Sequence, residues 1–241
     1  MKKVIFFLSL AVSAVMVVLL LNSPPAAKPY KPTAPIVEKA QKIIEIEALC
    51  QYPALPTGCE ATAAATVLRF LGSDITPEQF ANDWLERDPE FYYSGGTLCG
   101  PDPNKVFAGD PFSDNSFGCY SGAIERAINK NGGGFSAETV ETESLSELCS
   151  RFIDKNTPVI IWATIGMKES APGSSWLIDG KDPFTWISGE HCLVLIGYNE
   201  DYFFFSDPQS GSIVAYQKAI SEKRFYELGR QALIINKTPS Q

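Results

Sequence analysis

The sequence predicts an α+β fold in which an N-terminal helical half packs on a C-terminal antiparallel sheet. Segments with helical periodicity and capping residues lie before Pro158, whereas nearly every segment after it is short and rich in β-branched and aromatic residues, as strands are. The chain has 241 residues, 45% of them hydrophobic and 20% charged, which is typical of a folded protein. About 200 residues remain after the N-terminal segment, enough for one domain.

The charge balance and the histidine count exclude several classes of function. The 20 Lys and Arg against 28 Asp and Glu give a formal net charge of −8, and no basic cluster follows the first few residues. A phosphate backbone would meet no complementary surface, so we expect no nucleic-acid partner. The only histidine is His191, which rules out metal sites built from two imidazoles.

The N-terminus has the composition of an export signal. A basic start, Met-Lys-Lys, precedes an apolar stretch that extends to Leu21. The stretch reaches the lower length limit for a membrane span, so residues 1–21 are predicted to be a signal peptide or a signal anchor. The proline-rich residues 22–38 are expected to form an extended spacer. Residues 39–241 would then be the folded domain, extracellular or at the cell surface, with a membrane contact if the signal stays uncleaved.

Helices dominate the first half of the predicted domain. Alternating apolar and polar residues at 44–48 predict a short strand, and the alanine-rich run 59–71 predicts a central, mostly buried helix. Thr76 and Gln79 have the spacing of a capping box and predict a second helix that continues through Leu85.

The rest of the domain is predicted to be one long loop, further helices and a set of strands. Residues 91–120 are rich in glycine and proline, without sustained periodicity, and predict a long ordered loop. Further helices are expected at 121–130, 144–155 and 221–228. Strands are expected at 159–165, 184–187, 190–198, 201–206, 212–216 and 232–235. A site would lie where the helices meet the sheet.

Cys59 is the candidate nucleophile. It follows Gly58 and stands in the first turn of the predicted central helix. Unpaired backbone N–H groups and the positive end of the helix dipole favour a thiolate at such a position. The alternatives for a cysteine of an exported protein are half of a disulfide or a small buried residue.

His191 and Asp207 are expected to meet across a hairpin. His191 begins an apolar strand, which would hold its ring on a rigid scaffold as a base for Cys59. If a three-residue connection joins this strand to the next, Asp207 lies opposite His191, within reach of a carboxylate–imidazole hydrogen bond. With a two-residue turn the two side chains would face opposite sides unless a bulge intervened. Asp207 also suits an Asx turn before the following proline, and the two roles are compatible.

Gln51 is a candidate donor to the oxyanion of an acyl intermediate. Its neutral NH₂ group would bond more strongly as negative charge develops on the substrate oxygen. The alternative is a solvated residue at a strand end.

These residues lie in motifs that resemble a known family. The motifs are Gln51, Leu55-Pro-Thr-Gly-Cys-Glu-Ala-Thr62, Gly189-Glu-His-Cys-Leu-Val-Leu-Ile-Gly-Tyr198 and Phe205-Ser-Asp-Pro208. In this order they look like the double-glycine (bacteriocin-processing) peptidase-like family of papain-like cysteine peptidases. The loop motifs Gly100-Pro-Asp-Pro103 and Phe117-Gly-Cys-Tyr120 are similar to its standalone exported branch. The resemblance covers roughly residues 44–236.

The resemblance implies a papain-like fold with a defined set of catalytic residues. Cys59 would be the nucleophile, His191 the base, Asp207 the orienting residue and Gln51 the oxyanion donor, with no cofactor. The members that cut leader peptides after two glycines usually carry Gly after the nucleophile, where this chain has Glu60, and their Gln lies closer to the Cys. The resemblance therefore does not imply double-glycine specificity.

Five further cysteines accompany the candidate nucleophile: Cys50, Cys99, Cys119, Cys149 and Cys192. An odd number leaves at least one thiol unpaired. Two of them bracket the long loop and are candidates for a disulfide (Cys99 and Cys119), and Cys192 is expected in the core. No Cys-x-x-Cys spacing occurs, and we predict no metal ligands, with a Cys-rich zinc site as the alternative.

The sequence therefore predicts an exported, monomeric, thiol-dependent peptidase or acyl-transfer enzyme that acts on a peptide or protein substrate. The alternative from another class is a membrane-tethered, non-catalytic module on the same fold. It would hold a peptide or cell-wall ligand with the 91–120 loop and Trp162, Trp176 and Trp186, although such tryptophans more often pack in a core.

Overall fold

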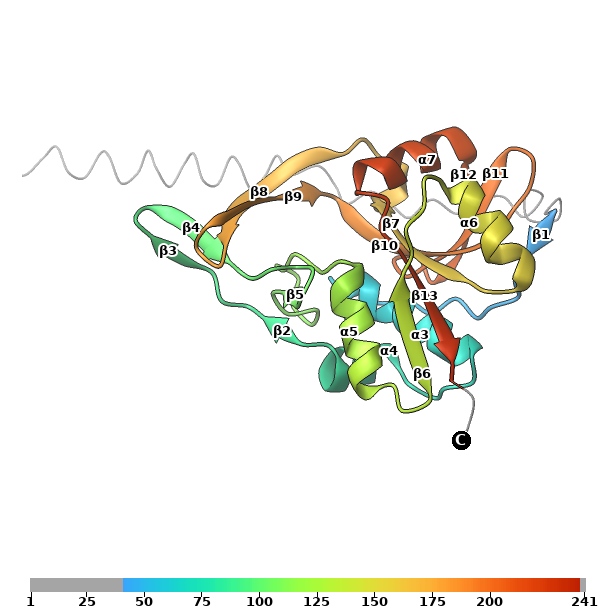
Figure 1. The fold of residues 1–241 in the computed structure, drawn as a ribbon, viewed down its shortest axis with the longest axis horizontal. Coiled ribbons are helices and arrows are strands. Elements are labelled where there is room, and N and C mark those ends of the chain that lie inside the picture. Colours follow the sequence, from blue (N-terminus) through green and yellow to red (C-terminus); the bar gives the residue numbers. More distant parts are fainter. Residues whose placement is uncertain (1–40, 239–241) are drawn as a thin grey trace, which may run out of the picture.

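The computed structural model describes residues 41–238, so the expected signal segment (1–21) and spacer (22–38) lie outside the described residues. Helices come first along the chain and an antiparallel sheet follows, which confirms the predicted α+β class (Figure 1). Within the described range, no helix is both long and apolar enough to cross a membrane.

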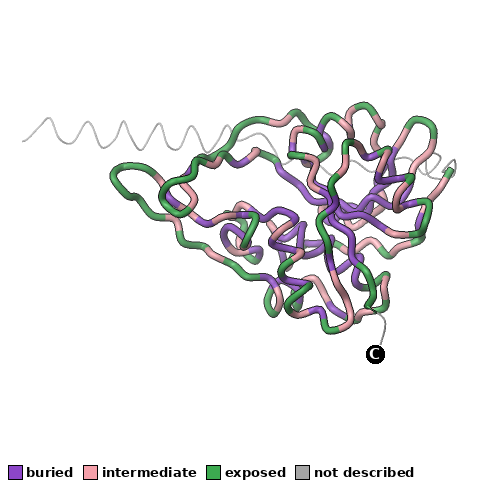
Figure 2. The backbone as a smooth tube through the Cα atoms, viewed as in Figure 1, coloured by how far each residue is buried: buried purple, intermediate pink, exposed green. Residues whose placement is uncertain are grey.

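A main sheet of seven strands forms the centre of the domain. The strand order is β12-β11-β10-β7-β13-β6, with β1 also paired to β10, and every pair is antiparallel. Every residue of β7 is buried, as is every residue of β10 up to Gly197, and Figure 2 shows this buried centre. The strands are β1 (Lys42–Ile43), β6 (Phe135–Thr139), β7 (Val159–Thr164), β10 (Glu190–Tyr198), β11 (Tyr202–Asp207), β12 (Ser212–Gln217) and β13 (Ala232–Lys237).

The helices pack around this sheet. The predicted central helix is α3 (Cys59–Phe70), which is buried from Cys59 to Leu68 and lies against β10. Its alanines permit this close approach because they add little bulk. The other helices are α4 (Pro77–Gln79), a π-helical turn (Phe80–Trp84), α5 (Ser121–Asn131), α6 (Leu145–Arg151) and α7 (Lys218–Glu227), with 3-10 turns at Ile153–Lys155 and Ile165–Met167.

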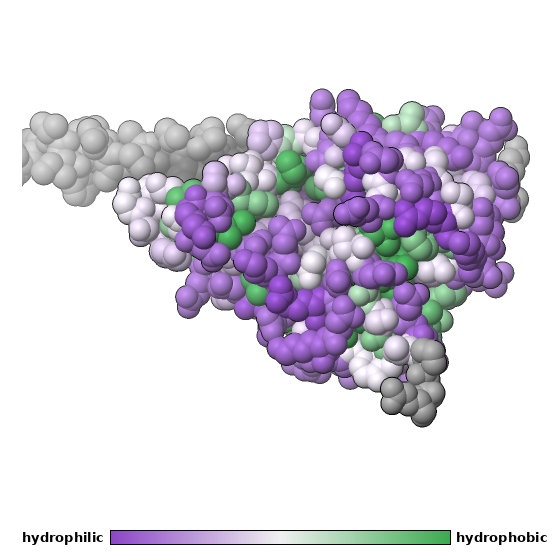
Figure 3. Space-filling view, in the orientation of Figure 1, coloured by the Kyte–Doolittle hydropathy of each residue, from purple (hydrophilic) through white to green (hydrophobic). Residues whose placement is uncertain are grey.

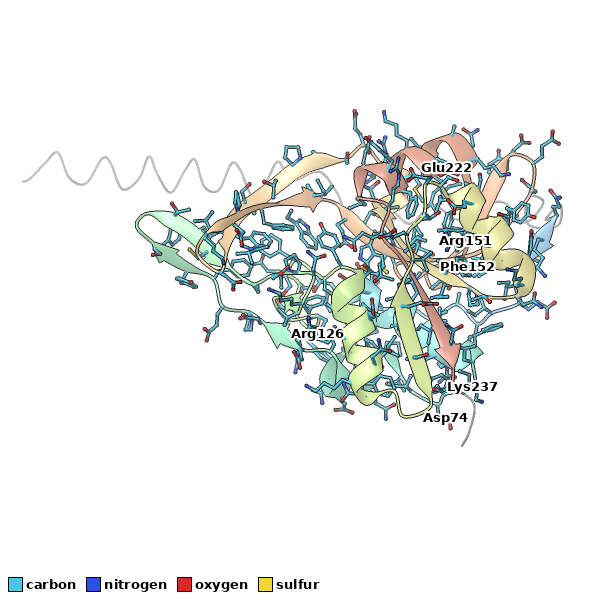
Figure 4. The ribbon with its side chains drawn as sticks, in the orientation of Figure 1. Asp74, Arg126, Arg151, Phe152, Glu222 and Lys237 are labelled. Carbon is cyan, nitrogen blue, oxygen red and sulfur yellow. The ribbon has the colours of Figure 1, made fainter. Side chains whose placement is uncertain are left out.

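The carboxylate of Glu222 in α7 caps a neighbouring helix. Its oxygens accept hydrogen bonds from the backbone N–H groups of Leu145 and Ser146 at 2.8 and 3.0 Å, at the start of α6 (Figure 4). An acidic group at a helix N-terminus satisfies unpaired donors and complements the helix dipole. This contact ties the two helices together.

A second, four-stranded sheet extends from the body as an arm (Figure 1). Its order is β3 (Tyr92–Ser94), β4 (Thr97–Gly100), β8 (Ala171–Ile178) and β9 (Asp182–Ser188). Short strands β2 (Arg87–Asp88) and β5 (Phe107–Ala108) pair in parallel beside it. The segment predicted as one long loop, 91–120, therefore contains several short strands. On the face shown in Figure 3, small apolar patches lie over the arm within a mostly hydrophilic surface.

One predicted strand is absent, and two observed strands are not predicted. The alternation at 44–48 does not form a strand, because only Lys42 and Ile43 pair with β10 and the chain then leaves the sheet. No pattern in the sequence predicts β6 or β8. Both strands are largely exposed or half-buried, so neither has a buried face that the sequence could reveal. They form because the fold brings them beside other strands with which they pair.

A β-bulge sets which face of β10 meets Asp207. Next to the turn, Tyr198 pairs with Phe203, whereas Val194 pairs with Ser206 after a register shift between Leu195 and Gly197. The predicted three-residue connection is therefore wrong. If the pairing next to the turn continued unchanged, Asp207 would lie opposite Val194, on the face of β10 away from His191. Beyond the bulge the pairing instead places Asp207 opposite Leu193, which lies on the same face of β10 as His191.

The predicted capping box at the second helix is confirmed. Thr76 Oγ1 accepts from the N–H of Gln79 at 3.2 Å, and the Thr76 N–H donates to Gln79 Oε1 at 3.0 Å. We expect Thr76→Ala to lower the free energy of unfolding by about 1 kcal/mol, because it leaves the Gln79 N–H without its side-chain acceptor. Urea denaturation measures the change. Gln79→Ala, which removes only the reciprocal bond, should cost less; equal stability of Thr76→Ala and wild type would contradict the prediction.

Candidate active site

His191 and Asp207 form a buried hydrogen-bonded pair at the N-terminal end of β10. His191 Nε2 lies 2.7 Å from Asp207 Oδ1, and both residues are buried. Burial opposes ionisation of Asp207, but the hydrogen bond and charge of His191, with the N–H of Gln209, hold the pKa of Asp207 below its usual value. Asp207 is thus a carboxylate that accepts from Nε2–H, which leaves Nδ1 as the basic ring nitrogen. The expected Asx turn is also present, since Gln209 N–H donates to Asp207 Oδ1 at 2.9 Å.

Cys59 is the first residue of α3, as predicted. Gly58 precedes it at the N-cap, where a Cβ would lie 2.8 Å from Leu55 Cβ, so the close approach requires glycine. The Cys59 Sγ forms a 3.3 Å hydrogen bond with Glu60 Oε2. Among the described residues no hydrogen bond joins Cys59 to His191.

The thiol of Cys59 does not have the low pKa that its helix position predicts. Burial, and then the charges of Glu60 and Glu190, raise the pKa of Cys59 well above its ordinary value. The dipole at the helix N-terminus favours the thiolate. Burial and the two nearby carboxyls oppose the thiolate, and their combined effect is larger. In the folded protein these groups therefore act against the thiolate that the helix position favours.

Glu60 and Glu190 are two buried carboxyls beside this sulfur. Burial raises the pKa of Glu60 to about 7, although the Cys119 N–H donates to Glu60 Oε1 at 2.6 Å. Burial and the charge of Glu60 raise the pKa of Glu190 well above its ordinary range. Two like charges this close cannot both ionise cheaply, so the pair retains a proton near neutral pH.

Gln51 lies at the site, but its amide hydrogens are already engaged. Its Nε2 donates to the carbonyl oxygens of Leu55 at 3.2 Å and Pro56 at 2.8 Å, while its buried Oε1 has no hydrogen-bond partner. The predicted alternative of a solvated residue is wrong, because Gln51 is buried. In this arrangement the amide stabilises the turn before Cys59 and presents no free N–H to a substrate.

One pocket brings the candidate residues together. Its volume is about 210 Å³ and its lining includes Cys59, His191, Gln51, Glu190, Phe117 and Trp186. Asp207 lies behind His191 and does not line it. The pocket is where the central helix meets the sheet, as predicted. The arrangement suits attack by a sulfur on a carbonyl group, with the imidazole as proton carrier.

The other cysteines and the tryptophans have structural positions. All six cysteines are free thiols, so the candidate disulfide between Cys99 and Cys119 is absent, and Cys192 is buried as predicted. The three tryptophans of the binding-module hypothesis are buried. Trp162 donates to the Cys119 carbonyl oxygen at 2.9 Å, and Trp176 to that of Pro101 at 2.8 Å. They are core residues, although Trp186 also borders the pocket.

Sequence reasoning missed Glu60 and Glu190 as parts of the site. A signal for Glu60 existed, because it is the one charged residue before the last turn of an otherwise apolar helix. Glu190 gave no such signal. It directly precedes His191 on a strand, where neighbouring side chains face opposite sides, and only the packing of α3 on β10 brings it to the sulfur.

Comparison with known proteins places the chain among peptidase-like sequences. Residues 43–233 match the model of the Peptidase C39-like family. The uncharacterized protein YvpB of Bacillus subtilis (strain 168) is 29% identical over 186 residues, which are 77% of this chain and 71% of that protein.

Solved structures resemble the fold. The crystal structure of a candidate C39-like peptidase from Bacillus anthracis matches with a TM-score of 0.71 and 23% identity, over 83% of this chain and 100% of that one. A double-glycine-motif protease from an AMS/PCAT transporter, crystallised with its leader peptide, matches with a TM-score of 0.46 and 16% identity, over 82% and 96% of the two chains. The first similarity shows that the two proteins share a fold.

Proposed function

The chain belongs to the Peptidase C39-like family, a relative of papain-like cysteine peptidases, and we propose from this that it is a thiol-dependent peptidase or acyl-transfer enzyme acting on peptide bonds. Cys59 is the nucleophile, His191 the base and Asp207 the residue that orients His191. The observation that carries the proposal is the buried 2.7 Å pair of His191 and Asp207 at a pocket that Cys59 also lines.

The reaction begins with a proton transfer, because the sulfur starts as a thiol. The Cys59 proton passes to His191 Nδ1, and the thiolate attacks the carbonyl carbon of the peptide bond. Asp207 stabilises the imidazolium through Nε2. The imidazolium then protonates the leaving amine, and the C–N bond breaks to give a thioester on Cys59. His191 next removes a proton from water, the hydroxide attacks the thioester, and the acid product leaves as the thiol reforms.

The oxyanion of each tetrahedral intermediate requires donors near the sulfur. As the first residue of a helix, Cys59 has a backbone N–H without a helical acceptor. Gln51 becomes a second donor when it exchanges one of its two carbonyl acceptors for the oxyanion. Substrate binding therefore includes a local change in the turn at Leu55 and Pro56.

The sequence supports an extracytoplasmic location for this activity. We propose that residues 1–21 export the chain, that 22–38 separate the membrane from the domain, and that 39–241 act as one monomeric domain. The substrate is a peptide or protein segment that reaches the pocket in an extended form. The proposal does not include double-glycine specificity, since Glu60 follows the nucleophile.

Digestion of a peptide library tests the proposal. The full chain, purified in detergent, is incubated with synthetic peptides, and products are identified by mass spectrometry with and without prior iodoacetamide treatment. We expect cleavage that the alkylating agent abolishes. Cleavage that survives complete alkylation of Cys59, or a library left intact by the untreated chain, would contradict the proposal.

Substitution of Asp207 separates its charge from its hydrogen-bonding role. Asp207→Asn keeps an oxygen that accepts from His191 Nε2–H but removes the negative charge beside the imidazolium. A charge-assisted hydrogen bond is about twice as strong as a neutral one, so we expect kcat to fall roughly tenfold with little change in KM. Asp207→Leu, which also loses the acceptor, should be slower still. Steady-state kinetics on one cleaved peptide measures both, and equal kcat values for the two variants would contradict the assigned role.

A further inference from the structure

Cys59, Glu60 and Glu190 form a compact cluster of potential metal ligands. One ligand atom from each residue lies within 4.8 Å of the other two, and the residues are only 6%, 0% and 8% exposed. The Cys59 Sγ and Glu60 Oε2 are 3.3 Å apart. A sulfur and an oxygen bound to one tetrahedral Zn²⁺ lie about 3.5 Å apart, so the Cys59–Glu60 pair already has the separation that a shared ion requires.

Glu190 provides independent support for a cation ligand. Its Oε1 is buried and has no hydrogen-bond partner. A buried carboxyl oxygen without a partner is costly, and the nearby Glu60 carries the same charge when ionised. A cation between the two carboxylates would engage this oxygen and replace the repulsion by attraction.

Glu60 is held in an orientation that suits coordination. The Cys119 N–H donates to Glu60 Oε1 at 2.6 Å, which leaves Oε2 directed at the Cys59 sulfur. Hydrogen bonds that fix a ligating carboxylate in this way are characteristic of metal sites. Gly118 permits the arrangement, because a Cβ there would clash with Glu60 Oε1 and lie 3.3 Å from Glu190 Oε2.

We propose that this cluster binds one Zn²⁺ ion, or a divalent ion of similar softness, through Cys59 Sγ and one oxygen each from Glu60 and Glu190. A water molecule on the pocket side completes the four ligands. The thiolate selects Zn²⁺ over Mg²⁺ and Ca²⁺, which prefer oxygen alone. Cys59 and Glu190 both line the pocket, which gives the ion a path to the site. Binding displaces the thiol proton of Cys59 and the proton of the carboxyl pair to solvent, without a redox step.

The consequence for activity rests on the proposed peptidase function. A sulfur bound to zinc cannot donate the same electron pair to a carbonyl carbon, so the ion is a reversible inhibitor and not a cofactor. Removal of the ion by a chelator returns the thiol to the reaction. Zinc availability outside the cell would then control the fraction of active enzyme.

Titration of the full chain with Co²⁺ tests the site without reference to catalysis. We expect one Co²⁺ per chain, an intense near-ultraviolet band from thiolate-to-cobalt charge transfer, and loss of that band when Zn²⁺ displaces Co²⁺. Cys59→Ala should abolish the band, and Glu190→Gln should weaken Co²⁺ binding at least about tenfold. Cys149→Ala, which removes a buried cysteine remote from the cluster, is the matched control and should bind as wild type does.

Several outcomes would overturn the site. The inference is wrong if the thiolate band persists in Cys59→Ala, if Glu190→Gln binds Co²⁺ as tightly as wild type, or if no band forms. Circular dichroism of each variant confirms folding. Glu60→Gln tests the second carboxyl ligand in the same Co²⁺ titration. Peptide hydrolysis is measured separately: a band without hydrolysis in the metal-free chain refutes the peptidase proposal alone, whereas hydrolysis without a band refutes the metal site alone.

Discussion

Cys59→Ala is expected to lower kcat for peptide hydrolysis by at least about 10⁴-fold, because removal of a nucleophile from a catalytic set leaves only the contribution of binding and oxyanion donors. The fold should persist. Alanine keeps the helix N-terminus intact, and the lost sulfur gives up its 3.3 Å hydrogen bond to Glu60 and its contact with the Cys192 backbone. Product formation followed by chromatography, together with thermal denaturation, measures the two effects. We expect a melting temperature within a few degrees of wild type.

Cys192→Ala is the matched control for this variant. Cys192 is a buried thiol on β10, one residue after His191, and its pKa is raised by burial and by Glu60 and Glu190, as for Cys59. It should retain kcat within a fewfold of wild type. Substantial turnover by Cys59→Ala would refute the nucleophile assignment. A wild-type chain that binds peptides as tightly as Cys59→Ala does, and cleaves none, would instead support the non-catalytic binding module.

The elements that carry Cys59 and His191 could be predicted from sequence because their patterns are local. The apolar, alanine-rich run of α3 and the continuous apolar run of β10 leave few alternatives for either segment. The contact between His191 and Asp207 could be predicted only conditionally. One extra residue at a bulge decides which face of β10 meets Asp207. Gly197 is a local sign of that bulge, but it does not by itself fix the register of the pairing.

The electrostatic state of the site could not be predicted from local sequence. The position of Cys59 at a helix N-terminus is visible in the sequence and favours a thiolate, but the opposing groups come from other elements. Glu190 arrives from β10, and burial depends on the whole core. Gln51 shows the same limit, since its place in the site follows from the turn before Cys59, whereas the orientation of its amide depends on carbonyls that the folded turn supplies.

The carboxyl pair predicts that the protein becomes less stable as the pH rises from about 5 to 8. Both pKa values are raised in the folded state, that of Glu60 from 4.5 to about 7. A raised pKa means that the folded state holds a proton which the unfolded state releases, so the stabilisation is complete below the unfolded pKa and is lost as the pH rises through the folded one. Because the two carboxyls titrate together, the loss belongs to the pair and is on the order of 3 kcal/mol in unfolding free energy. Denaturant unfolding at several pH values measures it.

Glu60→Gln isolates this effect from the other ionisable groups. Glutamine keeps an oxygen that accepts the Cys119 N–H, and it removes both the titration of Glu60 and the charge that raises the pKa of Glu190. The pKa of Asp207 is lowered, so that carboxyl is ionised in both states above pH 5 and adds no slope there. The unfolding free energy of Glu60→Gln should therefore fall less than that of wild type between pH 5 and 8. Parallel pH profiles for the two chains would show that folding does not raise the pKa of Glu60, and would contradict a proton shared by the carboxyl pair.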